Sequence, residues 1–345
     1  MEEKKQDGTG KIDDVQKIEV AQQPDVKASV LDYDTPGLLV GSAKRKQEAT
    51  EKQVKTDVAA SVEKEVVKEP EKNLHSEGQG ETAFGMDEVG RFSIKYALIS
   101  PILGFAKSLN RPEMEIVFEK NGLSGRFIDP AHVAMGSFFI SRYEFTQYMR
   151  KDDKDWKVGI DIKKILDLKI RSRDEIDIVL VENPLDEGTR VHRYRIRYQE
   201  VETSIRGLTQ EDGLYVPKIP KITMRNSVLL ERERVWSFFK AAEQVSDAFR
   251  VTLDKEGLKL TCKTDDTTIK TVIPKKDMTV EMTDAETTSA YSIEWVMPAF
   301  KNLREIRDIK ISLGSNDYPM KIDFLKGMVK MDDSVVSLLV APRVS

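Results

Sequence analysis

The chain of 345 residues contains a single cysteine, Cys262, and only three histidines, His75, His132 and His192. One cysteine excludes an internal disulfide framework and suits a reducing compartment. A zinc site of the multi-cysteine type is excluded as well, and the histidines are too scattered to replace it. We therefore expect no metal and no cofactor. Cys262 lies in an alternating strand pattern, which favours a small packing residue over a reactive thiol.

Long apolar runs are also missing. No stretch approaches the roughly 18 consecutive apolar residues of a membrane span. The first residues, Met1 to Lys5, contain no apolar core of a signal peptide. We expect a soluble, unexported protein without a membrane partner. Hydrophobic residues make up 39% of the chain, which is enough for real cores, and the length favours about two domains.

Aromatic residues are scarce in the first part of the chain. Up to residue 83 the only Phe, Trp or Tyr is Tyr33, and Lys, Glu, Asp, Gln, Val and Ser dominate without a sustained apolar period. Such a segment cannot bury enough surface to offset its ordering entropy. We expect residues 1–85 to be a disordered charged tail. Within it, Leu38–Val40 is either a short docking motif or incidental, and Lys44–Lys46 either a basic address or incidental.

An internal repeat follows the tail. Ile116–Leu123 and Val251–Leu258 share a pattern of strand, acidic turn with glycine, and strand, displaced by 135 positions. Alternating stretches such as Arg193–Tyr198 and Met320–Leu325 predict strands with one buried face. Because both halves contain a hairpin with a glycine turn, we predict antiparallel sheets and an α+β fold. A second block keeps nearly the same displacement, with Ile160, Ile176, Ile178 and Leu180 corresponding to Ile293, Ile309, Ile311 and Leu313.

Four stretches have helical periodicity: Ser100–Leu109, Asp161–Leu168, about Arg232–Val245, and Trp295–Leu303. Each places its apolar residues on one stripe, which predicts a face that packs. The other face tends to be basic. Taken alone, these charges are explained more simply by plain solvation than by nucleic-acid binding, because exposed helix faces are usually charged. The formal net charge of -4 argues against a general nucleic-acid binder and for a local basic surface.

Catalytic patterns are weak, and we predict that the protein is not an enzyme. Gly8–Lys11 contains glycine but lacks the spacing of a phosphate loop. The acidic pairs Asp152–Asp153 and Asp265–Asp266 fall in predicted turns, where solvation is the simpler explanation. A nuclease that uses clustered carboxylates to hold metal ions is the alternative of a different class.

The last segment, Leu338–Val344, is an apolar strand that ends in Ala-Pro-Arg. Taken alone, it fits a buried edge strand closed by a proline. It also closely resembles the carboxyl-terminal segment of archaeal sliding clamps, the proliferating-cell-nuclear-antigen (PCNA) family. The resemblance extends from roughly Arg91 to Ser345 and includes, in the family's order, Gly122–Leu123 with Phe127–Met135, Val216–Pro220, Val245–Asp247, and Thr288–Tyr291 with Trp295 and Lys301–Leu303.

This resemblance implies a DNA sliding clamp, a homotrimeric ring with antiparallel sheets outside and helices lining its hole. Such a ring acts as processivity factor for DNA polymerase and as docking platform in DNA replication and DNA repair. The resemblance implies clamp domain 1 at residues 86–205, an interdomain connector at 206–223 and clamp domain 2 at 224–345. The alternative is a subunit of a heterotrimeric or checkpoint-like clamp, in which the tail recruits something else.

The implied partners are duplex DNA, contacted without sequence readout, and DNA polymerase, clamp loader, flap endonuclease and DNA ligase, which bind through short peptide motifs. The implied location is cytoplasmic and nucleoid-associated, or nuclear if the source is eukaryotic. The implied DNA-facing residues are Lys107, Lys163, Lys164, Lys240, Lys301 and Arg304. The implied partner-peptide pocket is formed by Ile128, His132, Val133, Val216, Ile219, Pro319, Leu339, Val340, Ala341, Pro342 and Arg343.

Asp167 and Trp236 occupy helix positions where basic residues are common in relatives, so we expect an inner surface that is less basic than usual. His132 lies beside prolines and valines, which favours a packed or pocket-lining residue over a metal ligand.

Overall fold

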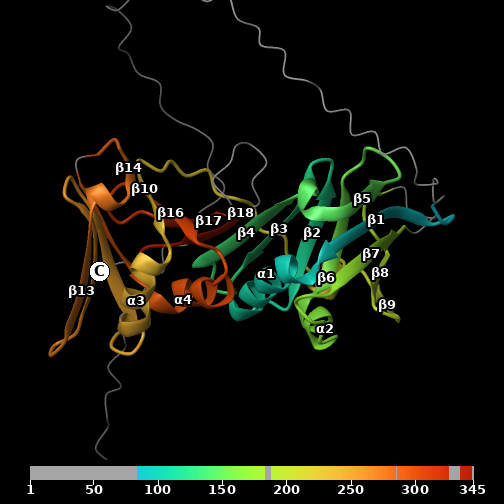
Figure 1. The fold of residues 1–345 in the computed structure, drawn as a ribbon, viewed down its shortest axis with the longest axis horizontal. Coiled ribbons are helices and arrows are strands. Elements are labelled where there is room, and N and C mark those ends of the chain that lie inside the picture. The colour runs from blue at the N-terminus through green and yellow to red at the C-terminus, as the bar shows by residue number, and fades with distance from the viewer. Residues whose placement is uncertain (1–83, 183–187, 285, 326–334, 344–345) are drawn as a thin grey trace, which may run out of the picture. The chain divides into compact units, whose positions relative to one another are not determined.

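The structure is a computed structural model that describes residues 84–182, 188–284, 286–325 and 335–343 (Figure 1). The predicted tail, with Leu38–Val40 and Lys44–Lys46, thus lies outside the described residues except for its last two positions. The described residues contain four α-helices, and all pairings between named strands are antiparallel. The predicted α+β class with antiparallel sheets is confirmed.

The described chain passes twice through one order of elements. The first repeat contains β1 (Glu88–Lys95), α1 (Tyr96–Ser108), β2 (Glu113–Glu119), β3 (Gly122–Ile128), β4 (Ala134–Ser141), β5 (Phe145–Arg150), β6 (Trp156–Asp161), α2 (Ile162–Asp167), β7 (Glu175–Val181), β8 (Arg193–Tyr198) and β9 (Val201–Arg206). The second contains β10 (Asn226–Glu231), α3 (Glu233–Ala242), β11 (Ala248–Leu253), β12 (Gly257–Lys263), β13 (Thr268–Pro274), β14 (Thr279–Met282), β15 (Thr287–Ser292), α4 (Ile293–Asn302), β16 (Asp308–Leu313), β17 (Met320–Leu325) and β18 (Val335–Val340).

Three sheets are built from these strands, in the orders β5-β1-β7-β8-β9, β14-β10-β16-β17-β18-β4-β3-β2-β6, and β13-β12-β11-β15. The nine-stranded sheet contains strands of both repeats, which meet where β18 pairs with β4. At this junction Val335 lies opposite Phe139, and Val340 lies opposite Ala134. The last strand of the second repeat is therefore hydrogen-bonded to the fourth strand of the first.

Equivalent glycines open the second strand of the β2–β3 and β11–β12 hairpins. A Cβ added to Gly122 would lie 2.1 Å from the carbonyl oxygen of Ile140, and one added to Gly257 would lie 2.1 Å from that of Ile273. Both residues also have positive φ, +156° and +149°. Only glycine fits so close to a backbone oxygen, so the two hairpins share one steric requirement. The repeat predicted from these segments is confirmed.

The main core contains the periodic residues that the sequence analysis matched between the two halves, seven of them on strands and Ile293 at the start of α4. The eight periodic residues are between 0% and 6% exposed, and Cys262 in β12 is fully buried, consistent with packing: Ile160, Ile176, Ile178, Leu180, Ile293, Ile309, Ile311 and Leu313.

The four helices form one layer, in which α2 contacts α1, α1 contacts α4, and α4 contacts α3 (Figure 1). Asn302 Nδ2 donates to Ser108 Oγ at 3.0 Å, which joins the two repeats. A Cβ on Gly104 would lie 2.4 Å from Asn302 Oδ1, so glycine permits this close approach of α1 and α4.

Helix α1 begins at Tyr96, four residues before the predicted start at Ser100. The N–H groups of Tyr96 and Ala97 donate to the carbonyl oxygens of Asp174 and Ser172, at 2.9 and 3.0 Å. A loop distant in sequence thus satisfies donors that have no partner within the helix. The other three predicted helices begin and end within about three residues of the observed ones.

Candidate nucleic-acid interface and partner groove

All six predicted DNA-facing residues are exposed. Lys107, Lys240 and Lys301 lie in the last turns of α1, α3 and α4. Positive side chains are favourable there because the carboxyl end of a helix carries partial negative charge. Lys163 and Lys164 lie in α2, and Arg304 follows α4. The residues are therefore distributed over the whole helix layer.

The ion pairs of this layer are weak. Lys164 pairs with Asp161 at 3.5 Å, Arg304 pairs with Glu305 at 3.4 Å, and Lys301 pairs with Glu243. Solvent screens such exposed pairs, which contribute about 0–1 kcal/mol each. Lys107, Lys163 and Lys240 form no ion pair with the described residues. Phosphate groups would thus meet little competition at these positions.

Trp236 and Asp167 behave differently from each other. The Trp236 ring lies parallel to the ring of Phe300, with centroids 6.2 Å apart, and the guanidinium of Arg232 lies 4.8 Å from the Trp236 ring. Arg232 is buried, donates to the Phe300 carbonyl oxygen at 2.7 Å, and has its pKa lowered by burial. The charge of Arg232 therefore lies inside the protein and not on the exposed face of the helix layer. Asp167 is exposed and contributes negative charge beside α2.

The loop after α2 contains further exposed cations that the sequence analysis did not single out, namely Lys169, Arg171 and Arg173. They flank Ser172 and Asp174, whose carbonyl oxygens receive the first N–H groups of α1. A signal was present, since three basic residues alternate over five positions just after the α2 stretch.

The segment between the repeats is anchored on the first repeat by three contacts. The ring of Tyr215 stacks on that of His132 with centroids 5.6 Å apart, and the Arg111 guanidinium lies 5.9 Å from the Tyr215 ring. Arg126 Nη1 donates to the Pro217 carbonyl oxygen at 3.3 Å. His132 is exposed, and its ring packs against Tyr215 of the connector instead of lining the groove described next.

A groove of about 340 Å³ lies beside this connector. Its floor is a small apolar cluster, separate from the main core, that contains Ile128, Met135 and Leu339 with Ile222 and Met224 packed against them. Two predicted residues, Ile219 and Leu339, line the groove directly. The full lining is Met135, Ser137, Ile219, Pro220, Ile222, Met224, Lys321, Ser337 and Leu339.

The remaining predicted pocket residues are not among those that line the groove, although Ile128 belongs to the apolar cluster of its floor. Val133 accepts a hydrogen bond from the Ala341 N–H at 2.8 Å, and Val216 and Pro342 are half-buried. Val340 is fully buried in the sheet and Pro319 is buried. Their side chains therefore lie inside the protein.

Arg343 fixes the segment after β18 to the second repeat. It forms an ion pair with Asp247 at 2.7 Å, and its N–H donates to the Ala290 carbonyl oxygen at 2.8 Å. The hydrogen bond from Arg343 holds the pKa of Asp247 below its usual range.

Sequence reasoning missed Tyr215, Ile222, Met224, Met135 and Lys321 around the groove. Part of the signal was present, because Ile219, Ile222 and Met224 are apolar residues that alternate with polar ones and prolines at the end of the connector and just after it. Which of them would face Leu339 depends on the path of the connector and could not be read from the sequence.

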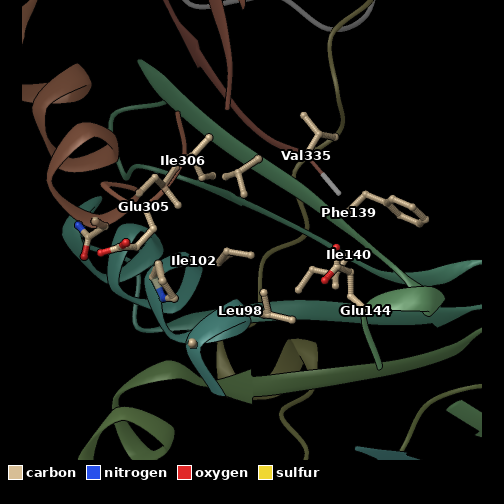
Figure 2. Close-up of a pocket in the computed structure, with 13 residues that line it drawn as sticks. Leu98, Ile102, Phe139, Ile140, Glu144, Glu305, Ile306 and Val335 are labelled. Carbon is tan, nitrogen blue, oxygen red and sulfur yellow. The ribbon is translucent and has the colours of Figure 1, made fainter. Parts of the chain in front are cut away.

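An apolar cavity of about 130 Å³ lies where the repeats meet, between α1, the β4–β18 pair and the segment after α4 (Figure 2). Leu98, Ile102, Phe139 and Ile306 dominate its lining, and the carboxylates of Glu144 and Glu305 are at its margin. Such a lining offers packing without the convergent polar groups of a catalytic pocket.

The acidic pairs noted in the sequence have local structural roles. Asp152 Oδ1 accepts from Trp156 Nε1 at 3.0 Å and from the Lys154 N–H at 3.1 Å. Asp266 Oδ1 accepts from the Thr264 hydroxyl at 2.9 Å. Among the described residues, no group of three or more His, Cys, Asp or Glu is placed to hold a metal ion. In the same part of the chain no helix is long and apolar enough to cross a membrane.

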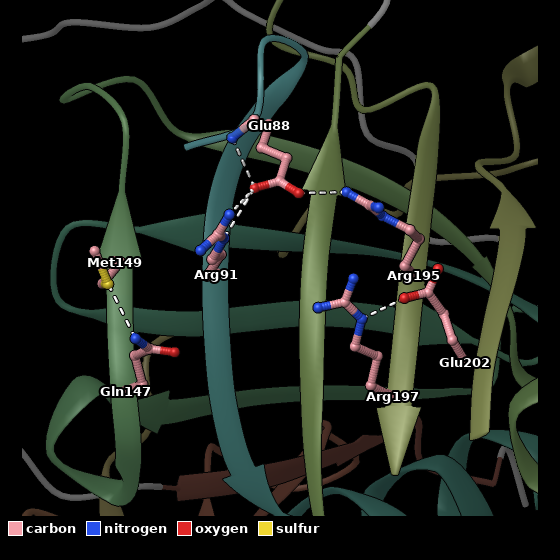
Figure 3. A network of polar contacts seen from close by, with 8 residues as sticks. Glu88, Arg91, Gln147, Met149, Arg195, Arg197 and Glu202 are labelled. Carbon is pink, nitrogen blue, oxygen red and sulfur yellow. Dashed lines mark hydrogen bonds and ion pairs between the residues drawn. The ribbon is translucent and has the colours of Figure 1, made fainter. Parts of the chain in front are cut away.

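The five-stranded sheet carries a polar network on one face (Figure 3). Arg91 Nε donates to Glu88 at 2.9 Å, Arg195 also bonds Glu88, and Arg197 bonds Glu202. Burial alone would raise the pKa of Glu88, but the Gly85 N–H and the two arginines hold it below its usual range. These charges are paired within the sheet, although the buried Arg195 Nε has no hydrogen-bond partner among the described residues.

No protein-family model matches the chain. The chain is 30% identical over 192 residues to the DNA polymerase sliding clamp of Picrophilus torridus, covering 55% of this chain and 73% of that protein. It is 26% identical over 232 residues to the DNA polymerase sliding clamp of Methanosarcina mazei, covering 67% and 89%.

Solved structures give the same result for the fold. A structure of the C-terminal region of FEN-1 bound to A. fulgidus PCNA matches with a TM-score of 0.62 at 22% identity, covering 74% of this chain and 99% of that one. PCNA from Thermococcus kodakaraensis matches with a TM-score of 0.61 at 19% identity, covering 74% and 100%.

Proposed function

The chain belongs to the DNA polymerase sliding clamp (PCNA) family. We propose that it acts as a sliding clamp in the form of a homotrimeric ring around duplex DNA. A sliding clamp is not an enzyme and acts in DNA replication as the processivity factor that keeps DNA polymerase on its template.

The pairing of β18 with β4 carries the proposal of a closed ring. It joins the last strand of one repeat to the fourth strand of the other. The equivalent strands left over are β9 and β13, and each forms the outer edge of its sheet in the described structure. An unpaired edge is a template for pairing with another chain. If β9 of one copy pairs with β13 of the next as β18 pairs with β4, copies add head to tail until the ring closes.

The repeat also predicts the register of this contact. Val335 begins β18 as Val201 begins β9, and Phe139 and Val272 both lie opposite the residue two positions after the hairpin glycine. The observed pair Val335–Phe139 therefore maps onto Val201 of one copy and Val272 of the next. Both valines are unusually exposed in the single chain, 46% and 48%, and the contact would cover them.

In such a ring the helix layer faces the DNA. Lys107, Lys163 and Lys240 present charges without carboxylate partners in the described structure, and the loop after α2 adds Lys169, Arg171 and Arg173. Contacts from lysine and arginine to phosphates are independent of sequence and exchange readily, which permits sliding. The internal use of Arg232 and the charge of Asp167 support an inner surface of moderate positive charge.

We assign the groove beside the connector to partner peptides, with residues 86–205 and 224–345 as the two clamp domains and 206–223 as the connector between them. Its floor of Met135, Ile222 and Leu339 offers an apolar site for the anchor side chains of a short peptide. The A. fulgidus relative has been solved with the C-terminal region of FEN-1 bound, which supports flap endonuclease as a partner here. DNA polymerase, clamp loader and DNA ligase are the other expected partners, in the nucleoid or in a eukaryotic nucleus.

Light scattering of the full chain over a dilution series tests the ring. A homotrimer has three times the chain mass of 39.3 kDa at all concentrations down to its dissociation constant. A persistent monomer or dimer contradicts self-assembly and favours the heterotrimeric or checkpoint-like alternative, because the contact uses main-chain pairing that a related subunit also offers.

Retention on DNA tests the topology separately. Ring molecules loaded onto a nicked circular plasmid remain bound through gel filtration and slide off once the plasmid is cut. Equal retention on circular and linear DNA contradicts encirclement.

A further inference from the structure

A second basic surface lies outside the helix layer, in an open cleft of about 370 Å³. Three connections of the first repeat form it: the β2–β3 turn, the short turn Arg142–Glu144 after β4, and the end of β5 with the loop that follows. Its lining residues are Lys120, Arg142, Tyr148, Arg150, Lys151, Asp152 and Asp153.

Hydrogen bonds fix the frame of this cleft. The Tyr148 hydroxyl lies 2.7 Å from the Glu119 carbonyl oxygen and 2.6 Å from that of Gly122, which ties β5 to the β2–β3 turn. The Arg150 side chain is only 8% exposed, bonds the Lys154 carbonyl oxygen and pairs with Asp155 at 3.6 Å. These contacts hold the loop without using the outer cations.

The outer cations are Lys120, Arg142 and Lys151. The first two form no ion pair with any described residue, and Lys151 pairs only with Glu182, at 3.4 Å, in a partly exposed pair. The lining contains four cations, Lys120, Arg142, Arg150 and Lys151, against the two carboxylates of Asp152 and Asp153. The lining is thus locally positive on a chain whose formal net charge is -4, and it suits an oxyanion.

An exposed aromatic ring beside the cleft narrows the class of ligand. Tyr143 is 74% exposed, and the Arg142 guanidinium lies 5.6 Å from its ring. Cations that contact phosphates next to a ring that can stack on a base are the elements of single-strand binding. An acidic peptide would use the cations and leave the ring without a role.

We propose that this cleft binds single-stranded nucleic acid, with phosphates on Lys120, Arg142 and Lys151 and a base stacked on Tyr143. The proposal does not depend on ring closure or on the partner groove. Strand β3 runs from Gly122 beside the cleft to Ile128 in the groove floor, a span of about 20 Å. Single-stranded nucleic acid and a partner peptide can therefore be held at opposite ends of β3.

Fluorescence anisotropy of the full chain with a labelled oligothymidylate of about 12 nucleotides tests the proposal. The variant Lys120→Glu/Arg142→Glu/Lys151→Glu should bind at least about tenfold more weakly, with the slope of log K against log salt reduced by about 2. The matched control is Lys255→Glu/Lys275→Glu/Lys276→Glu. It makes the same charge change at the β11–β12 turn and in the short turn after β13, and should bind within about twofold of the original protein. Light scattering checks that all variants keep the original mass.

The role of the Tyr143 aromatic ring is tested by Tyr143→Ala, which should weaken oligonucleotide binding at least about fivefold. Tyr143→Phe keeps the aromatic ring and should restore binding. Three results would overturn the proposal. The first is equal loss in the matched control, which indicates general charge. The second is loss only in Lys107→Glu/Lys164→Glu/Lys240→Glu, which places the oligonucleotide on the helix layer. The third is equally tight binding of a glutamate peptide of the same charge, unaffected by Tyr143→Ala, which assigns the cleft to acidic protein segments.

Discussion

The two repeats share one order of elements and differ in the side chains of the equivalent strands β5 and β14. In the first repeat Tyr148 lies opposite Phe92, and Arg150 lies opposite Gly90. Through the common pairing with β7 and β16, the equivalent residues of the second repeat are Val280, opposite Val228, and Met282, opposite Asn226. The second repeat therefore lacks the hydroxyl and the guanidinium that frame the basic cleft.

The hairpin glycines show the opposite behaviour, because Gly122 and Gly257 approach equivalent carbonyl oxygens at the same distance. This close backbone contact is thus the same in both repeats, whereas the side chains of the equivalent strands β5 and β14 differ. A duplicated fold supplies two copies of a scaffold and leaves its loops free for separate roles.

The largest effect should come from a change at β9, one of the two sheet edges proposed to pair between copies. Val201→Glu should convert a trimer to monomers by weakening assembly at least about 100-fold, because an unpaired charge would be covered at the contact. The measurement is the solution mass over a dilution series.

The double variant Val201→Lys/Val272→Glu places a pair of opposite charges at the contact. It should therefore assemble more tightly than Val201→Glu. Ile219→Glu, an equally exposed apolar residue in the groove, is the control and should leave the mass unchanged. An unchanged mass in Val201→Glu would refute the predicted register.

The hairpin glycines test the equivalence of the backbones. Gly122→Val and Gly257→Val should each lower the free energy of unfolding by about 3 kcal/mol, since each added Cβ meets a backbone oxygen that cannot move aside. Urea denaturation at fixed protein concentration measures both variants. Losses that differ by more than about 1 kcal/mol would show that the two hairpins are not equivalent.

The helix layer tests whether both repeats face the DNA. Replacing Lys107, Lys164 and Lys240 with glutamate should reduce DNA-dependent stimulation of polymerase about tenfold, since contacts with phosphate are lost in both repeats. Binding of a labelled partner peptide to the groove should stay unchanged. If stimulation and peptide binding fell together, the division between inner and outer surfaces would be wrong.

The smallest effect concerns the ends of the repeats, where Arg206 pairs with Asp212 and Arg343 pairs with Asp247. The hydrogen bond from Arg206 lowers the pKa of Asp212 to about 2. A carboxyl with a depressed folded-state pKa stabilises the protein above its unfolded pKa, near 4, and loses this contribution as the pH falls to about 2. The melting temperature of Asp212→Asn should therefore approach that of the original protein over this range.

The pair at the end of the second repeat behaves in the same direction, because Arg343 also depresses the pKa of Asp247. Asp247→Asn is thus the matched variant. A difference in melting temperature that does not shrink as the pH falls below about 4 in either variant would show that the carboxylate acts through something other than its charge.

Much of the fold could be predicted from the sequence because periodicity reports burial. The strands Arg193–Tyr198 and Met320–Leu325 have the predicted bounds, and the periodic isoleucines lie in the core. The start of α1 could not be predicted, since its first donors are satisfied by a loop more than 70 residues away.

The sites divide in the same way. The positions of the lysines on four helices follow from helical periodicity, but the contacts among the helices depend on the close approach of Gly104 to Asn302. The groove residues Ile128, Ile222 and Leu339 belong to segments distant in sequence, and no local pattern places them together.

Two similar halves, antiparallel sheets with amphipathic helices, and membership of the sliding clamp family can be read from the chain alone, because periodicity, glycine turns and motifs are local properties. The three-dimensional arrangement was needed to show which strands remain as edges, which cations lack partners among the described residues, and which turns meet to form the basic cleft. These depend on long-range pairing such as that of β18 with β4, which is set by the packing of the whole chain and not by any one segment.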